Sequence, residues 1–209
     1  MAGYADRWCV KSSKENLVVV QNLKKQNILC AGPGLILVNP KYLHNIAAAI
    51  RAASCFDVTR LVWTGSRIDL SPLERLPREE RMKGYKDVLW THDKLDKPFN
   101  FFQPNITPVC VELLENSEPL TTFQHPDNAV YVFGPEDGGV PQVIRRFCHR
   151  FVHIQSNHCL NLAAAVNVVL HDRKAELQLS GKQPILPTGE MLKESRGPMN
   201  LSFPGWDGK

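Results

Sequence analysis

Short apolar runs alternate with longer helix-forming stretches from about residue 34 onward, and this alternation constrains the fold most strongly. Strands that alternate with helices are typical of an α/β domain with a mainly parallel sheet. The strands are apolar throughout, which favours helices on both faces of the sheet. The predicted strands are Leu35–Val38, Leu61–Trp63, Thr107–Leu113, Val130–Phe133 and Phe151–Ile154, and the predicted helices are Lys41–Cys55, Pro141–Arg146 and Leu160–Glu176.

The two ends of the chain differ from the alternating part. Residues 1–33 are polar and end in a Gly-Pro loop signal, which predicts an N-terminal extension. Residues 34–178 form the predicted α/β domain. Residues 179–209 are rich in glycine and proline and are predicted to be an irregular tail. Between the strands, residues 66–104 show no clean periodicity.

Composition limits the classes of protein to which the chain can belong. With 209 residues, 43% of them hydrophobic, it can bury one sizeable core. We expect no membrane-spanning segment and no secretory signal, because no apolar stretch is long enough or correctly placed. Six scattered cysteines without a C-x-x-C pair indicate reduced thiols in a cytoplasmic protein and no zinc site. A formal charge of +4 is compatible with a polyanionic partner but does not require one.

The first segment that points to chemistry is Asn39–Phe56, where a strand leads into an alanine-rich helix. His44 and Arg51 are seven residues apart and therefore share a helix face, with Ala47 and Ala48 between them. These small residues let a ligand or another backbone come close to the arginine. An ordinary amphipathic helix with one solvated arginine is the alternative.

The second segment is Val130–Pro141, where an apolar strand runs into a glycine-rich turn that contains Glu136. Glycine permits close backbone approach, and ligands bind at the carboxyl ends of strands in open α/β sheets. The phosphate-loop and dinucleotide-binding patterns are both missing, which disfavours a nucleotide hydrolase or a dinucleotide-dependent dehydrogenase. A glycine-rich turn without a ligand is the alternative.

The third segment is His153–Arg173, in which a strand end and a polar loop precede a helix that is apolar on nearly every side. Such a helix must be buried in the core or across a subunit interface. Asn161, near the start of the helix, could cap it or could place its amide in a ligand pocket.

In their order and spacing, the three segments resemble the motifs of the SpoU/TrmH family of SPOUT RNA methyltransferases. Asn45 and Arg51 match the telling positions of N-x-G-A-x-x-R-T-A. The second segment matches hydrophobic-G-x-E-x-x-G-[LIV] through Phe133, Gly134, Glu136, Gly139 and Val140, and the third matches through Ile154, Leu160, Asn161 and Leu162. The resemblance covers about residues 35–176.

The chain departs from the family pattern at several positions. Ala47 replaces the glycine of the first motif, Asp57 replaces a glycine after the helix, and Gln155 replaces a proline. Cys159 replaces the serine of the third motif, and a thiol is a weaker hydrogen-bond donor than a hydroxyl. The contact that this serine usually makes is therefore in question.

The resemblance implies that the C-terminal part of the α/β domain forms a deep trefoil knot, a rare arrangement among proteins. It also implies S-adenosylmethionine as the cofactor, held in the knot largely by backbone groups. The residues that it implies for cofactor binding are Val111, Glu112, Phe133, Gly134, Ile154, Cys159, Leu160 and Asn161. The helix after Asn161 is expected to pack against its twin in a homodimer.

The implied reaction is methylation of a ribose 2′-hydroxyl in RNA, with Arg51, Glu136 and Asn161 as the catalytic residues. A guanidinium with a pKa above ~12 is a poor base. We therefore expect Arg51 to hold the target phosphate and to stabilise negative charge on the 2′-oxygen. Glu136 and Asn161 would orient Arg51 or the nucleotide, and no metal is required.

Basic side chains are expected to bind RNA outside the knot. The expected RNA-binding residues are Asn45, Arg51, Arg75, Arg78, Arg81 and Lys83, with Arg60, Arg67 and the lysines of residues 1–33 as further candidates. Interspersed acidic residues leave a solvated helix face as the alternative for residues 74–87.

We expect tRNA rather than rRNA, because no added RNA-recognition domain is evident. There are two competing hypotheses. One is a knotted RNA-binding or assembly protein without turnover, which Cys159 favours. The other is a generic α/β small-molecule enzyme.

Overall fold

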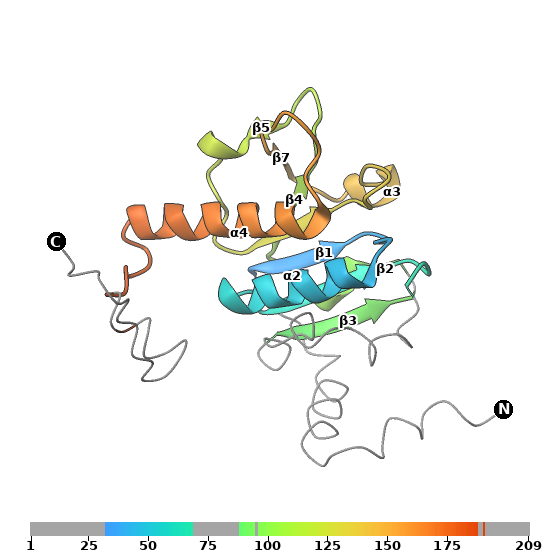
Figure 1. Cartoon of the computed structure of the whole chain (residues 1–209), viewed down its shortest axis with the longest axis horizontal. Helices are drawn as coiled ribbons and strands as arrows, with labels where there is room; N and C mark the ends of the chain where they lie inside the picture. The colour runs from blue at the N-terminus through green and yellow to red at the C-terminus, as the bar shows by residue number, and fades with distance from the viewer. Residues whose placement is uncertain (1–31, 69–87, 95, 188–189, 191–209) are drawn as a thin grey trace, which may run out of the picture. The chain divides into compact units, whose positions relative to one another are not determined.

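The computed structural model describes residues 32–68, 88–94, 96–187 and 190, which form a seven-stranded sheet with parallel neighbours (Figure 1). The sheet order is β3-β2-β1-β6-β4-β7-β5. The strands are β1 (Gly34–Leu37), β2 (Arg60–Thr64), β3 (Leu89–Asp93), β4 (Thr107–Val111), β5 (Glu118–Pro119), β6 (Ala129–Phe133) and β7 (Arg150–His153). The helices are α2 (Leu43–Cys55), α3 (Gln142–Arg145) and α4 (Leu162–Leu179), with 3-10 turns η3 (Pro98–Phe101) and η4 (Leu120–Thr122).

Helices cover both faces of the sheet, as the sequence predicted. Side chains alternate between the faces along β1. Leu35 and Leu37 belong to a core cluster that includes residues of α2 and α4. Ile36 belongs to a second cluster, which includes Ile144 of α3. The α/β class with a mainly parallel sheet is therefore confirmed.

The sequence missed two strands, and both lie at the edges of the sheet. β3 falls in the stretch without periodicity, and its sequence LWTHD carries polar residues because it has a neighbour on one side only. β5 has two residues, one of them a proline, at the opposite edge. The five predicted strands are present, with slightly different ends.

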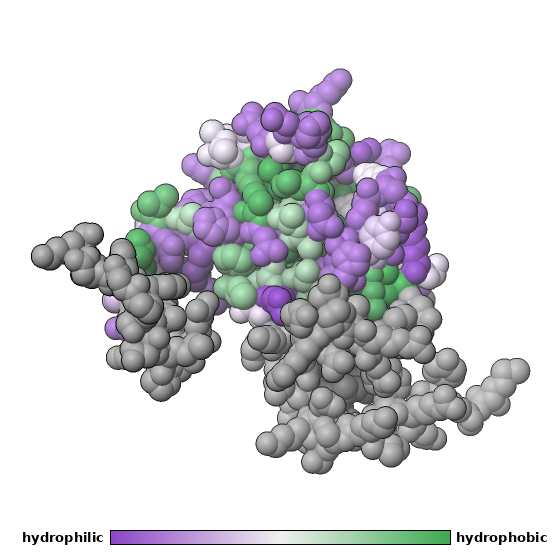
Figure 2. Space-filling model, viewed as in Figure 1, coloured by the Kyte–Doolittle hydropathy of each residue, from purple (hydrophilic) through white to green (hydrophobic). Residues whose placement is uncertain are grey.

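Helices α2 and α4 lie side by side (Figure 1), and residues in or next to them contact each other in two places. Near their starts, Asn161 donates a hydrogen bond to Asn45, and further along the ring of Phe56 meets the edge of His171. Pale green, apolar side chains are visible over this part of the surface in Figure 2.

Helix α4 was expected to be buried all round, and in the single chain only one side of it is buried. Leu162 and Val166 face the core, whereas Ala164 and Val168 are exposed. The structure divides into two compact units after Arg173, inside α4. None of the helices in the described ranges is long and apolar enough to cross a membrane.

Candidate active site

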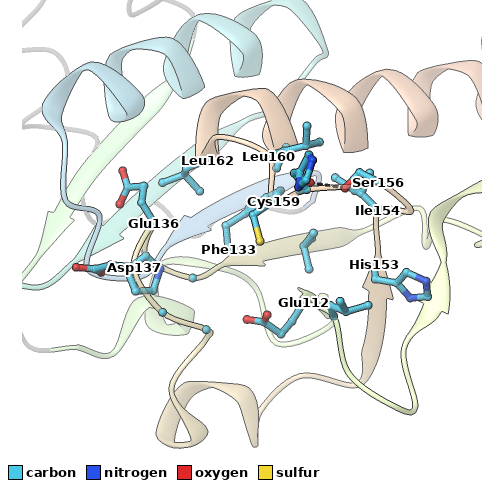
Figure 3. Close-up of a pocket in the computed structure, with 18 of the residues that line it drawn as sticks. Glu112, Phe133, Glu136, Asp137, His153, Ile154, Ser156, Cys159, Leu160 and Leu162 are labelled. Carbon is cyan, nitrogen blue, oxygen red and sulfur yellow. Dashed lines mark hydrogen bonds between the residues drawn. The ribbon is translucent and has the colours of Figure 1, made fainter.

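A cavity of about 600 Å³ opens at the carboxyl ends of three adjacent strands, β4, β6 and β7 (Figure 3). Parallel strands bring their carboxyl ends to one edge of the sheet, where the connecting loops can enclose a ligand. The walls are the ends of these strands, the loop of residues 134–139 and the loop of residues 154–160. The volume lies in the usual range for a small-molecule site.

Seven of the eight residues predicted to bind the cofactor line this cavity. They are Val111, Glu112, Phe133, Gly134, Ile154, Cys159 and Leu160. The eighth, Asn161, lines a neighbouring cavity instead. His153 and residues 156–158 also line the larger cavity, and no sequence motif pointed to them. Their position at the end of a strand and in the loop that follows it was the available signal.

Close backbone approach at the glycines shapes the floor of the cavity. A Cβ on Gly134 would lie 2.8 Å from the carbonyl carbon of Gly139 and 2.8 Å from the nitrogen of Val140. A Cβ on Gly139 would lie 2.8 Å from the Oε2 atom of Glu112. The same Oε2 atom accepts a hydrogen bond of 2.8 Å from the Val140 N–H. The loop thus folds tightly onto the strand ends, and its hydrogen bond to the Glu112 carboxylate holds it there.

The side chains around the cavity are apolar in the middle and charged at one side. Phe133 and Ile154 come from the ends of β6 and β7, and the Cys159 thiol points into the enclosed space (Figure 3). Glu136 and Asp137 lie on the opposite side of the site from His153 in this view. A ligand with a flat apolar part and a positive charge would complement such walls.

The second cavity, of about 230 Å³, lies between α2 and the start of α4. Its lining consists of small and polar residues, namely His44, Asn45, Ala47, Ala48, Arg51, Asn161 and Ala163. The structure therefore brings together Arg51 and Asn161, which were predicted to be catalytic, and Asn45, which was predicted to bind RNA. The predicted shared face of His44 and Arg51 is also confirmed.

Asn161 caps α4 and also lines the second cavity. Its Oδ1 atom accepts hydrogen bonds from the N–H groups of Ala163, at 2.9 Å, and Ala164, at 3.3 Å. These bonds cap α4. Its amide nitrogen donates a hydrogen bond of 3.0 Å to the Oδ1 atom of Asn45. The cap therefore also reaches into the polar lining of the second cavity.

Glu136 joins this arrangement to the glycine-rich loop. Asn45 is only 1% exposed, and its side-chain amide donates a hydrogen bond to Oε1 of Glu136. The Lys41 N–H donates to Oε2 of Glu136 at 2.7 Å. Together with the Asn161 bond, these contacts link all three motif segments, and we call the chain of side chains Asn161–Asn45–Glu136 the motif bridge.

The hydrogen bonds determine the charge state of Glu136. Burial raises the pKa of its carboxyl, but the donors from Lys41 and Asn45 outweigh burial and hold the pKa below its ordinary value. These hydrogen bonds stabilise the ionised form of Glu136. A low pKa does not suit a general base working near neutrality.

The basic residues predicted to bind RNA have different environments. Arg60 is fully buried on β2 and donates to Thr91 at 3.0 Å, so its assignment as an RNA contact was wrong. Arg67 is partly exposed and pairs with Asp137 at 2.6 Å, and this hydrogen bond holds the pKa of the Asp137 carboxyl below its usual value. The predicted residues Arg75, Arg78, Arg81 and Lys83 lie outside the described residues.

Replacement of Asn161 by alanine is expected to lower the free energy of unfolding by about 1 kcal/mol, within the range of about 0.5–2 for a lost N-cap. Urea unfolding followed by circular dichroism measures the change. Asn157→Ala, at an exposed position of the same loop, is the matched control and should change stability by less than about 0.5 kcal/mol. Equal stability of the two variants would show that the cap and the bond to Asn45 contribute nothing.

Comparison with known proteins relates this geometry to a family of enzymes. Residues 33–171, about two thirds of the chain, match the SpoU rRNA Methylase family. The matched region contains all of the residues that line both cavities. A comparison with the sequences of curated proteins gave no match.

Solved structures with the same fold include three methyltransferases or RNA-modifying enzymes. An rRNA methyltransferase from Sinorhizobium meliloti is 19% identical with a TM-score of 0.62, over 73% of this chain and 60% of that protein. The SpoU methyltransferase AviRb from Streptomyces viridochromogenes, in complex with AdoMet, is 19% identical with a TM-score of 0.61, over 76% and 65%. A TrmH/SpoU tRNA modifying enzyme from A. aeolicus is 18% identical with a TM-score of 0.60, over 85% and 94%. The chain thus spans less than two thirds of the length of the first two proteins.

Proposed function

Because the chain belongs to the SpoU rRNA Methylase family, we propose that it methylates a ribose 2′-hydroxyl of RNA with S-adenosylmethionine, the cofactor of this family. The observation that carries the proposal is the motif bridge. It joins Glu136, which lines the larger cavity, to Asn161, which lines the cavity of Arg51. One cavity would then receive the cofactor and the other the nucleotide, on either side of a shared polar wall.

The larger cavity fits the cofactor in shape and in charge. Phe133, Ile154 and Leu160 offer apolar surface for an adenine ring, and the glycine-rich loop offers exposed backbone. The ionised carboxylate of Glu136 complements a sulfonium cation. When bound, S-adenosylmethionine supplies a methyl group that its sulfonium sulfur makes electrophilic. Cys159 would contribute packing in place of the hydrogen bond expected from the family serine.

The residues of the chain would align the nucleotide and stabilise its charge. Arg51 would bind a phosphate of the target nucleotide through paired N–H donors. It would also stabilise negative charge on the 2′-oxygen as the hydroxyl loses its proton. The motif bridge would hold Asn45 and the first turns of α2 in place, so Glu136 and Asn161 act as positioning residues.

Three further assignments complete the proposal. We infer a tRNA substrate, supported by the tRNA modifying enzyme from A. aeolicus, whose length this chain nearly spans, with 94% covered. We also infer a homodimer formed through α4, supported by the exposed Ala164 and Val168 on the helix. The trefoil knot stays a prediction. A cytoplasmic location is supported by the four cysteines of the described part, all of which are free thiols.

Mass spectrometry of nucleosides tests the proposed reaction. Total RNA, and separated tRNA and rRNA, are incubated with the protein and isotope-labelled S-adenosylmethionine and then digested. We expect a labelled 2′-O-methylated nucleoside, most abundant in the tRNA fraction. Calorimetry should show cofactor binding with a micromolar dissociation constant. Binding without transfer would instead support the non-catalytic hypothesis, and a base-methylated product would contradict the ribose assignment.

A further inference from the structure

Two exposed aromatic rings lie at the start of α2, and the proposed mechanism uses neither of them. The rings of Tyr42 and His44 stack with their centroids 5.3 Å apart and their planes at 17°. The Lys41 ammonium lies over the Tyr42 ring, 5.3 Å from its centroid. Tyr42 is 44% exposed. We call this pair the Tyr42–His44 stack.

The start of the helix does not require a tyrosine. Tyr42 occupies the N-cap position, but its side chain makes no capping hydrogen bond. Its backbone has φ −122° and ψ 129°, an extended conformation open to any residue. Residues with short polar side chains are strongly preferred at this position. The ring therefore needs an explanation other than helix stability.

The stack borders the cavity proposed for the nucleotide. His44 lines that cavity together with Arg51 and Asn161. The stack thus reaches from the cavity wall, which Arg51 also lines, to the exposed Tyr42, and the Lys41 ammonium lies over the Tyr42 ring. A flat ring surface next to cationic groups complements a nucleotide, which has a flat base and an anionic phosphate.

We propose that the Tyr42–His44 stack receives the base of an unpaired RNA nucleotide, at or next to the methylated ribose. This inference rests on the proposed function and specifies its substrate class, namely a single-stranded or looped nucleotide. A base in a duplex is already stacked on both sides and cannot continue a protein stack. Since every base has a π-face, the platform accepts different bases and selects for the unpaired state.

Fluorescence binding with a defined probe tests the platform without any methyl transfer. The probe is an unstructured oligoribonucleotide of ten nucleotides with a central 2-aminopurine. It is used alone and in a duplex with its complement. We expect the full-length protein to quench the single-stranded probe and to bind the duplex at least ~10-fold more weakly. Tyr42→Ala and His44→Ala should each weaken single-strand binding about 5- to 100-fold, the range for one lost stacking partner.

Three controls separate stacking from folding. Tyr42→Phe should restore binding, because it keeps the ring without the hydroxyl. Phe147→Ala removes a ring that is 49% exposed elsewhere and should leave probe binding unchanged. Calorimetry with S-adenosylmethionine should give wild-type affinity for Tyr42→Ala and His44→Ala, showing intact cavities.

The possible outcomes distinguish this inference from the proposed function. Equal probe binding by wild type, Tyr42→Ala and His44→Ala, or equal binding of single strand and duplex, would overturn the platform. Loss of binding in Tyr42→Ala and His44→Ala with rescue by Tyr42→Phe would support it, even if no methylated nucleoside is found. Methyl transfer by the wild type, together with equal probe binding by wild type, Tyr42→Ala and His44→Ala, would leave the proposed function standing and remove the platform.

Discussion

Replacement of Arg51 by alanine is expected to lower the rate of methyl transfer by about 10²–10³-fold, the usual cost of removing one group that stabilises transition-state charge. The affinity for S-adenosylmethionine should stay unchanged, because Arg51 lines the smaller cavity and not the proposed cofactor cavity. Initial rates with labelled cofactor and calorimetric titration measure the two effects separately.

Two further variants make the Arg51 result specific. Arg51→Lys keeps the positive charge but loses the planar pair of donors, so we expect activity between those of wild type and Arg51→Ala. Arg146→Ala removes an exposed arginine directly after α3 and should leave the rate unchanged. Full activity of Arg51→Ala would exclude Arg51 from the mechanism, and loss of cofactor binding would assign it to the other cavity.

Replacement of Gly134 by alanine should weaken cofactor binding by about 5- to 150-fold and lower the free energy of unfolding by about 1–3 kcal/mol, the usual cost of overpacking. The added methyl group would lie 2.8 Å from two backbone atoms of the loop, the carbonyl carbon of Gly139 and the nitrogen of Val140. A backbone contact of this kind can be relieved only by moving the loop. That loop is a wall of the proposed cofactor cavity.

Gly138→Ala is the matched control in the same loop. Its added methyl group would meet the Cγ atom of Pro135 at 3.7 Å, which is an ordinary van der Waals distance. We expect stability and cofactor affinity close to wild type, measured by urea unfolding and calorimetry. If Gly134→Ala and Gly138→Ala behave alike, the close approach at Gly134 does not shape the cofactor site.

The central part of the sheet could be predicted from sequence because it is buried on both faces. β1 and β6 are wholly buried and read as continuous apolar runs. β3 lies at an edge, and the run LWTHD mixes polar and apolar residues, so it gave no recognisable pattern. Prediction therefore succeeded where burial dictates composition and failed at the edges.

For the site, the order of the motifs predicted which residues meet, but their contacts could not be predicted. Seven of the residues expected around the cofactor do line one cavity. The motif bridge depends on side-chain orientations across segments 91 and 116 residues apart in sequence, which no local pattern encodes. Arg60 was misassigned for a related reason. Its charge suggested RNA, whereas the guanidinium is buried beside Thr91 and Phe101.

The bond between Asn161 and Asn45 has a consequence for how activity can arise during folding. The Asn161 side chain both caps α4 and donates to Asn45, whose own amide donates to the Glu136 carboxylate on a distant turn. Neither of the two cavities can take its final form until the residues near positions 45, 136 and 161 have all come together. We therefore expect cofactor binding and methyl transfer to appear together in a single late step of folding. Fragments that lack the segment around Asn161 should be inactive, and not only slower.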